Sequence, residues 1–291
     1  MLNFMEKKLK SPLIASSCIA TENTDNILRL AEQGIGGAIL KSCADYTREE
    51  CTVGRNFAFE KSTGYTYASS PFSREIMTLG ECTAMLRDLR PVTDMLLIPS
   101  FTAESLNPET WLPACAALES LGADGIQLDF FYMGCLIGQD GFGKKLAALL
   151  SELLCSIRVP IMPKLNVNLP KDFIMPLLKK SGVEYVSLLD SVRSPYLEYD
   201  ASSDSYNISG RLAPQSTSCF GSWQLPLTLG YTYTAADYGL RICAGGGVTS
   251  AGDVKKLIAA GAETVQSASF LTKYPYRAKE LLAACIEGKF H

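Results

Sequence analysis

The sequence predicts an α/β protein, a (β/α)8 TIM barrel that carries two long insertions. Strand-like and helix-like segments alternate along all 291 residues. The strand-like segments are short apolar runs, which is typical of parallel strands buried on both faces. A glycine-rich turn between the last two strands is also where such barrels commonly bind phosphate. Length alone suggests two domains, but α/β barrels often run this long, so we predict one domain over residues 1–291.

Eight segments are predicted strands because they are short and rich in apolar or β-branched residues. They span residues 12–16, 37–41, 95–101, 125–130, 160–165, 185–189, 240–244 and 264–267. Longer segments with helical periodicity follow them. These predicted helices span residues 24–33, 73–89, 108–121, 143–156, 171–181, 225–238, 251–260 and 276–287.

Two connections are too long to be simple loops. Residues 55–71 alternate aromatic and polar side chains, which predicts a hairpin over the barrel mouth. Residues 191–223 contain YLEYD and SYNIS, which predict a second hairpin. Long ordered loops are usually lids or binding loops, and an exposed insertion without such a role is the alternative.

Composition narrows the function classes. The net charge of −3 argues against a nucleic-acid or membrane-surface partner. Without an apolar signal segment or membrane span we expect a cytoplasmic protein. The ten cysteines include no C-x-x-C pair, so we interpret most of them as core residues rather than cluster ligands. The only histidine is His291, which argues against His-dependent triads and His-ligated zinc, and we predict no metal site.

The run LRICAGGGVTSAGDVKKLIAAGAETVQSASF predicts a phosphate-binding turn. Gly245, Gly246 and Gly247 permit positive φ angles and close approach of a ligand to the backbone. Thr249 and Ser250 are good N-caps for the following helix, whose positive end faces the same loop. The next strand brings Ala268 and Ser269 alongside. A turn without a ligand is the alternative, and the pattern is not the dinucleotide GxGxxG motif.

Polar residues follow several predicted strands, at the end of the barrel where chemistry occurs. Lys41 and Lys164 each end an otherwise apolar strand, which is costly unless the ammonium is paired or faces a ligand. One interpretation is ion pairing to Asp129 or Asp190. The other is a cationic environment for an electron-rich ring or an anion.

The segments SPLIASSC, GGAILKS, VPIMPKL and ICAGGGVTSAGDVKKLIAAGAETVQSAS resemble the class 1 dihydroorotate dehydrogenases. These are FMN-dependent TIM-barrel oxidoreductases that convert dihydroorotate to orotate in pyrimidine biosynthesis. The resemblance covers nearly the whole chain in order and is strongest in the last fifty residues. It implies an FMN cofactor, a small-molecule substrate and a homodimer.

The resemblance assigns roles to individual positions. Ala15, Ser16 and Ser17 would line one side of the flavin, and Lys164 would face its N1/O2 edge, where a cation stabilises the reduced ring. The phosphate would lie against the glycine turn, and Ala268 stands where the family usually has glycine. The implied cofactor-binding set is Ala15, Ser16, Ser17, Lys41, Ser42, Asp129, Lys164, Asp190, Gly221, Ser222, Gly245, Gly246, Gly247, Ala268 and Ser269.

The substrate side departs from the family. Tyr132 stands at the position of the catalytic base, and Cys135 follows three residues later, so the candidate catalytic residues are Lys41, Tyr132, Cys135 and Lys164. The asparagines that clamp the pyrimidine are also replaced, one of them by Asp190. An ionised aspartate only accepts hydrogen bonds, and it repels a carboxylate. We therefore expect an FMN-dependent oxidoreductase. Its substrate is either dihydroorotate or another reduced ring, and the sequence gives the two about equal weight.

Two other functions stay open. A flavin-free lyase or aldolase would use Lys164 as a Schiff base, because burial favours the neutral amine. A catalytically inactive barrel would bind only a phosphorylated ligand.

Overall fold

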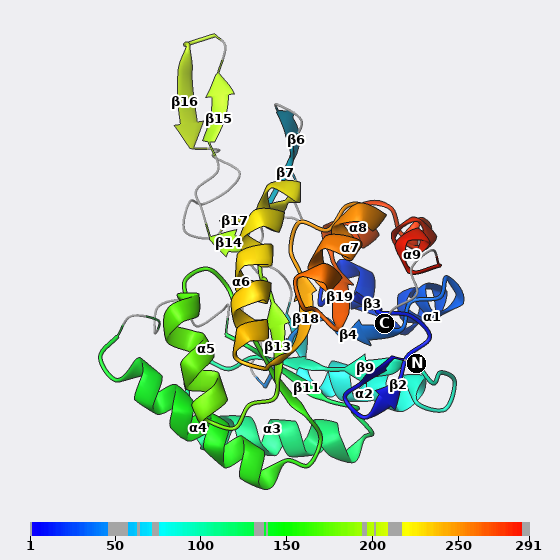
Figure 1. Ribbon diagram of the computed structural model, residues 1–291, viewed down its shortest axis with the longest axis vertical. Helices are drawn as coiled ribbons and strands as arrows, with labels where there is room; N and C mark the ends of the chain where they lie inside the picture. The colour runs from blue at the N-terminus through cyan, green and yellow to red at the C-terminus, as the bar shows by residue number, and fades with distance from the viewer. Residues whose placement is uncertain are drawn as a thin grey trace.

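The chain folds around a parallel sheet of 11 strands flanked by helices (Figure 1). The computed structural model describes residues 2–45, 58–62, 65–71, 76–130, 137, 139–193, 197–200, 202–208 and 217–286. Within these ranges the strand order is β8-β5-β10-β11-β12-β13-β18-β19-β3-β4-β9. This mixed α/β architecture is compatible with a TIM barrel.

Each of the eight predicted strands contains an observed one. The intact strands are β3 (Leu13–Ala15), β4 (Gly37–Ile39), β11 (Ile126–Asp129), β12 (Ile161–Lys164), β13 (Tyr185–Leu188), β18 (Arg241–Gly245) and β19 (Thr264–Ser267). The predicted strand 95–101 is divided into β9 (Leu96–Ile98) and β10 (Ser100–Phe101). The break falls at Pro99, which has no N–H to donate to a ladder.

The two halves on either side of Pro99 pair with different parts of the sheet. β9 pairs with β4, whereas β10 pairs with β11 and with the short strand β5 (Cys43–Ala44). β5 in turn pairs with β8 (Met77–Thr78). Residues 37–44 and 96–101 therefore run side by side in two short ladders rather than one continuous ladder.

The eight predicted helices are present. They are α1 (Thr24–Glu32), α2 (Leu79–Leu89), α3 (Pro108–Ser120), α4 (Phe142–Ser156), α5 (Lys171–Lys180), α6 (Leu225–Asp237), α7 (Ala251–Ala259) and α9 (Ala278–Ile286). The predicted start of α2 at residue 73 was wrong, because the helix begins after Thr78. Thr78 and Glu81 form a capping box, with the Thr78 hydroxyl accepting from the Glu81 N–H. The short helix α8 (Ser269–Lys273) and the 3-10 turns η1 (Ile19–Thr21) and η4 (Ser222–Gln224) were not predicted.

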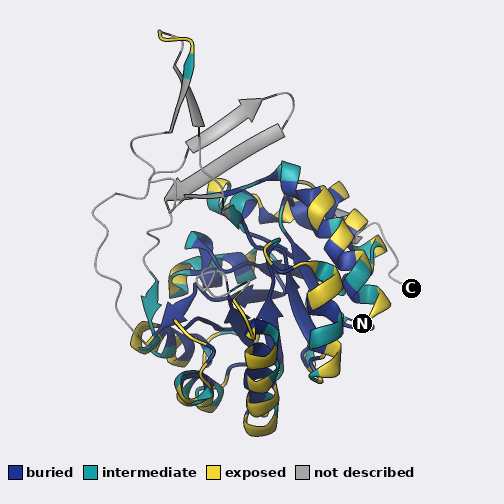
Figure 2. Ribbon diagram, turned by 90° about the vertical axis from the view of Figure 1, so that its left-hand side faces the viewer, coloured by how far each residue is buried: buried dark blue, intermediate teal, exposed yellow. Residues whose placement is uncertain are grey.

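Buried strands occupy the centre of the molecule, and the helices present their exposed sides outward (Figure 2). A short hairpin of β1 (Asn3–Phe4) and β2 (Lys7–Lys8) lies at the start of the chain. Its Phe4 ring packs at right angles against Tyr185, with ring centroids 5.2 Å apart. The hairpin thus adds a small apolar cluster beside the main core.

Both predicted hairpins are confirmed. β6 (Ala58–Ser62) pairs antiparallel with β7 (Tyr65–Pro71), and β15 (Leu197–Asp200) pairs antiparallel with β16 (Ser205–Ile208). The sequence did not predict that the two insertions join. β17 (Thr217–Gly221) pairs with β7 and with β14 (Val192–Arg193), so the order is β14-β17-β7-β6. Figure 1 shows this second sheet above the main one, with β15 and β16 farthest out.

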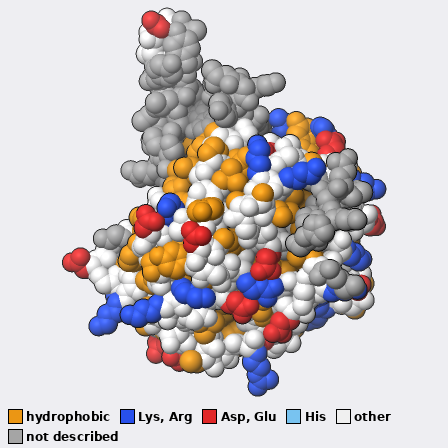
Figure 3. Space-filling view, viewed as in Figure 1, with side chains coloured by type: hydrophobic (Ala, Val, Ile, Leu, Met, Phe, Trp, Pro, Cys, Tyr) orange, Lys and Arg blue, Asp and Glu red, His pale blue; other side chains and the backbone are white. Residues whose placement is uncertain are grey.

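On the face in Figure 3, Lys and Arg side chains are interspersed with Asp and Glu among the described residues. Within the described ranges, no helix combines the length and the apolar character needed to cross a membrane.

Candidate functional site

A pocket lies at the carboxyl ends of the central strands, beneath β17. It encloses about 880 Å³ of space, part of it open to solvent, which is within the usual size range of small-molecule sites. Ten of the predicted cofactor residues line it: Ser16, Ser17, Lys41, Lys164, Asp190, Gly221, Gly246, Gly247, Ala268 and Ser269. Segments from both ends of the chain therefore meet where the sequence placed the site.

The other predicted cofactor residues lie outside the pocket lining: Ala15, Ser42, Asp129, Ser222 and Gly245. Ala15 is buried within β3, where it pairs with Ser267 and Ala38. A Cβ on Gly245 would overlap Gln266, so this glycine allows β18 and β19 to pack closely. Ser42 and Asp129 are buried and bonded to each other, one layer below the pocket.

The glycine turn has both a packing role and a free backbone edge. Gly246 and Gly247 have φ angles of 100° and 85°, which favour glycine. A Cβ on Gly247 would also overlap the backbone nitrogen of Leu225 at the start of α6. Among the described residues, the backbone N–H groups of Gly247 and Val248 have no hydrogen-bond acceptor. The turn can therefore donate to an anion in the pocket.

The amino end of α7 is already occupied by a carboxylate. Ser250 is the N-cap, as predicted, and its hydroxyl accepts from the Asp253 N–H. The Asp253 carboxylate accepts from the Thr249 N–H at 3.2 Å and from the Ser250 hydroxyl at 2.8 Å. Because this carboxylate balances the positive end of the helix, a phosphate would gain less from α7 than the sequence suggested. The N–H groups that remain available to a phosphate are those of Gly247 and Val248 in the glycine turn.

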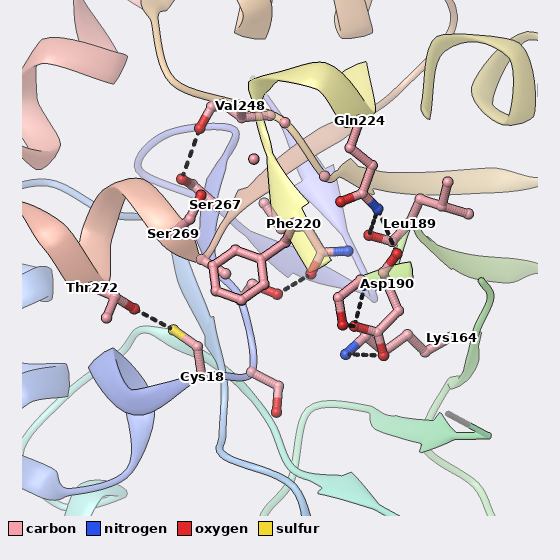
Figure 4. A pocket seen from close by; sticks show the side chains of 18 of the residues that line it. Cys18, Lys164, Leu189, Asp190, Phe220, Gln224, Val248, Ser267, Ser269 and Thr272 are labelled. Carbon is pink, nitrogen blue, oxygen red and sulfur yellow. Dashed lines mark hydrogen bonds and ion pairs between the residues drawn. The ribbon is translucent and has the colours of Figure 1, made fainter. Parts of the chain in front are cut away.

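Lys164 is 6% exposed and forms an ion pair inside the pocket. Its Nζ lies 2.9 Å from Asp190 Oδ2 and 3.9 Å from Asp129 Oδ2, and Figure 4 shows the Asp190 contact. Asp190 Oδ1 accepts from the Ser191 N–H at 2.7 Å. The ion-pairing interpretation of Lys164 is thus confirmed, and two carboxylates lie within 4 Å of its ammonium. Lys41 also lines the pocket at 4% exposure, and its N–H donates to Thr21.

A chain of buried hydroxyls runs from the pocket into the sheet. Ser17 Oγ lies 3.1 Å from Ser42 Oγ, and the Ser42 hydroxyl donates to Asp129 Oδ2 at 2.7 Å. Ser100 Oγ lies 3.1 Å from Ser42 Oγ and accepts from Gln127 Nε2 at 2.8 Å. The sequence placed Ser17, Ser42 and Asp129 at one site without predicting these contacts.

Sequence reasoning missed several residues of the pocket, among them Gln266, Gln224 and Phe220. Gln266 in β19 accepts from the Ser16 hydroxyl at 2.8 Å and donates to Ser187 Oγ at 2.8 Å. Gln224 donates to the Leu189 carbonyl at 3.3 Å. Phe220 of β17 lies between the Ser267 side and the Asp190 side of the pocket in Figure 4. A glutamine within the apolar run ETVQSAS was the available signal for Gln266, and no local signal marked Phe220.

Some predicted residues fall outside the described part of the chain. They are Tyr132 and Cys135, the two candidate bases, and His291. Their predicted roles, and the predicted inactivity of His291, stay predictions.

Comparison of the sequence with models of known protein families and with curated proteins gave no match.

Proposed function

We propose that the chain is an FMN-binding oxidoreductase built on a closed (β/α)8 barrel. The observation that carries this proposal is the pocket itself, which gathers ten of the implied flavin-binding residues from segments between Ser16 and Ser269. The strand pairing on either side of Pro99 supports closure, since β9 pairs with β4 and β10 pairs with β11. The family resemblance supports both parts of the proposal.

The chemistry of the lining fits FMN. Backbone donors at Gly247 and Val248 and the hydroxyls of Ser267 and Ser269 suit a phosphate and a ribityl chain. Phe220 offers an aromatic face to a planar ring. When bound, FMN would accept the electrons that the substrate gives up. The protein would hold the cofactor, orient it and carry the proton.

The ion pair between Lys164 and Asp190 disfavours an anionic substrate. Asp190 lines the pocket beside Lys164, so the ammonium is not available alone to an anionic substrate. A carboxylate such as that of dihydroorotate would meet Asp190 as well as Lys164. We therefore propose a neutral reduced ring as the substrate and expect dihydroorotate turnover below about 1 s⁻¹. Steady-state assays with a dye acceptor measure this rate, and faster turnover would restore dihydroorotate as the substrate.

The same ion pair bears on the lyase alternative. A Schiff base forms by attack of a neutral amine, whose nitrogen keeps a lone pair. Asp190 and Asp129 at 2.9 and 3.9 Å favour the ammonium form of Lys164 instead. The described geometry therefore favours a flavin site over a Schiff-base lyase.

The direct test is the cofactor content of the purified protein. Denaturing release followed by chromatography should yield FMN near one per chain, with neither FAD nor NAD. Gly252→Ala is a matched control because Gly252 lies in α7 away from the pocket lining, and its flavin content should equal that of the wild type. A colourless protein that takes up no added FMN would refute the proposal. A yellow protein whose flavin no tested donor reduces would favour the inactive binder.

A further inference from the structure

The hydroxyl chain below the pocket has a defined direction. Ser17 lines the pocket at 6% exposure, whereas Asp129 is 1% exposed and lies below the lining. Between them stands Ser42, within 3.1 Å of Ser17 Oγ and 2.7 Å of Asp129 Oδ2. An ionised carboxylate has no proton to donate, so the Ser42 hydroxyl must donate to Asp129.

This donation fixes the remaining hydrogens. A hydroxyl has one proton, and Ser42 donates it in the hydrogen bond to Asp129. Ser42 can therefore only accept hydrogen bonds from Ser17 and Ser100. The Ser17 proton therefore points down toward Ser42. Its oxygen lone pairs are left for a group in the pocket, and Ser17 meets a ligand as an acceptor.

Ser100 forms a second branch of the chain, and its hydroxyl proton keeps one direction. Ser100 accepts from Gln127 Nε2 at 2.8 Å, so its own proton goes to Ser42 whichever way the chain is polarised. If Asp129 becomes protonated, it donates to Ser42, and Ser42 then donates to Ser17. Of the residues named in this chain, Ser17 is the one that lines the pocket.

Lys164 also lies close to the inner end of the chain. The Lys164 ammonium lies 3.9 Å from Asp129 Oδ2, and both groups are almost wholly buried. The carboxylate at the inner end of the chain is the group that can take up a proton.

We propose that Ser17 is the proton-accepting group of this pocket, acting through Ser42 on Asp129. Ser17 Oγ takes a proton from the bound ligand and passes its own proton to Ser42, which passes its own to Asp129. One O–H bond forms and one breaks at each serine, and the carboxylate becomes a carboxylic acid. As the base for an oxidised substrate this role rests on the proposed function, with Ser17 as the catalytic residue and Ser42 and Asp129 as positioning residues.

The test uses a reaction that needs no flavin. A fluorophosphonate ester reacts with an activated serine: the Ser17 Oγ–P bond forms, the P–F bond breaks, fluoride leaves, and the serine proton moves through Ser42 to Asp129. Peptide mapping by mass spectrometry identifies the labelled residue and the labelling rate. Flavin content is measured on the same samples, so failure of the FMN proposal is seen separately from failure of the relay.

We expect labelling at Ser17 in the wild type and a rate about 10²- to 10⁴-fold lower in Asp129→Asn. Asparagine keeps an oxygen that accepts from Ser42 but takes up no proton. Ser42→Ala should have the same effect, and Ser42→Thr, which keeps the hydroxyl, should restore labelling. A merely structural role for Ser42 would not separate these two variants.

The matched control is Thr102→Val. Thr102 is a fully buried residue of the same region whose hydroxyl has no partner among the described residues. Its variant should label at the wild-type rate. An unlabelled Ser17 in the wild type, or equal rates in the wild type and Asp129→Asn, would overturn the proposal. If Asp129→Asn fails to fold, the comparison of Ser42→Ala with Ser42→Thr decides the question.

Discussion

Replacing Lys164 by Met should destabilise the protein strongly. Methionine keeps much of the length and apolar stem of lysine but carries no charge, so Asp190 and Asp129 would stay buried without the Lys164 ammonium. At an effective dielectric constant of about 20, unit charges 2.9 Å apart attract by about 6 kcal/mol, and charges 3.9 Å apart by about 4 kcal/mol. Desolvation of the lysine offsets much of this attraction, and breaking a buried pair costs about 3–5 kcal/mol in practice.

Urea unfolding followed by circular dichroism at about pH 7 measures the cost. We expect the free energy of unfolding to fall by about 3–5 kcal/mol. Adding Asp190→Asn to the Lys164→Met variant should recover part of the loss, since it removes one of the stranded carboxylates.

Lys171→Met is the matched control. Lys171 lies 3.1 Å from Asp172, but both side chains of this pair are well exposed. Exposed pairs contribute about 0–1 kcal/mol, so this variant should unfold nearly as the wild type does. The reasoning would be refuted if Lys164→Met cost no more unfolding free energy than Lys171→Met.

Three further predictions follow from local geometry. Gly247→Ala should lose about 1–3 kcal/mol of unfolding free energy, because φ is 85° and the added Cβ would overlap the start of α6. Gly230→Ala, in open space within α6, should gain about 0.5–1 kcal/mol. Urea midpoints that shift in the same direction for both variants would contradict this prediction. Thr102→Val should gain about 1–2 kcal/mol of unfolding free energy, since it removes a buried hydroxyl that has no partner in the part of the chain that the structure describes. An unchanged or lower stability would count against that assignment. Iodoacetamide at about pH 8 should modify the exposed Cys155 but not Cys115, because burial raises the pKa of the Cys115 thiol to about 12 and keeps it protonated there. Mass spectrometry of tryptic peptides measures the alkylation rate of each cysteine, and equal rates would contradict the prediction.

The sequence was sufficient for the elements of the main sheet because each is encoded locally. Short apolar runs marked the strands, and capping residues such as Ser250 marked helix starts. The start of α2 was missed because residues 73–77 (SREIM) contain no glycine or proline to interrupt a helical pattern, although the Thr78 and Glu81 capping box was present in the sequence. α8 was missed because five residues give too little periodicity to recognise.

The site was predictable as a set of residues but not as a network. The strand-end rule placed Lys164 near Asp129 and Asp190, yet distances decide which carboxylate it pairs with, and the sequence carries no distances. The contacts of Gln266 depend on three neighbouring strands meeting at one level. The bonds from Ser17 to Ser42 likewise need the actual register of β3 and β4.

The sheet that joins the two insertions makes them one unit. Phe220 pairs with Ala68 and Cys219 pairs with Ser69, so strands about 150 positions apart support each other above the pocket. Pairing between strands so far apart in the sequence carries a loop-closure entropy cost that a local hairpin avoids. An engineer who exchanges or shortens only one insertion would leave the other without its ladder partner. The two segments must be transplanted together, and Phe220 would carry any such change directly into the wall of the pocket.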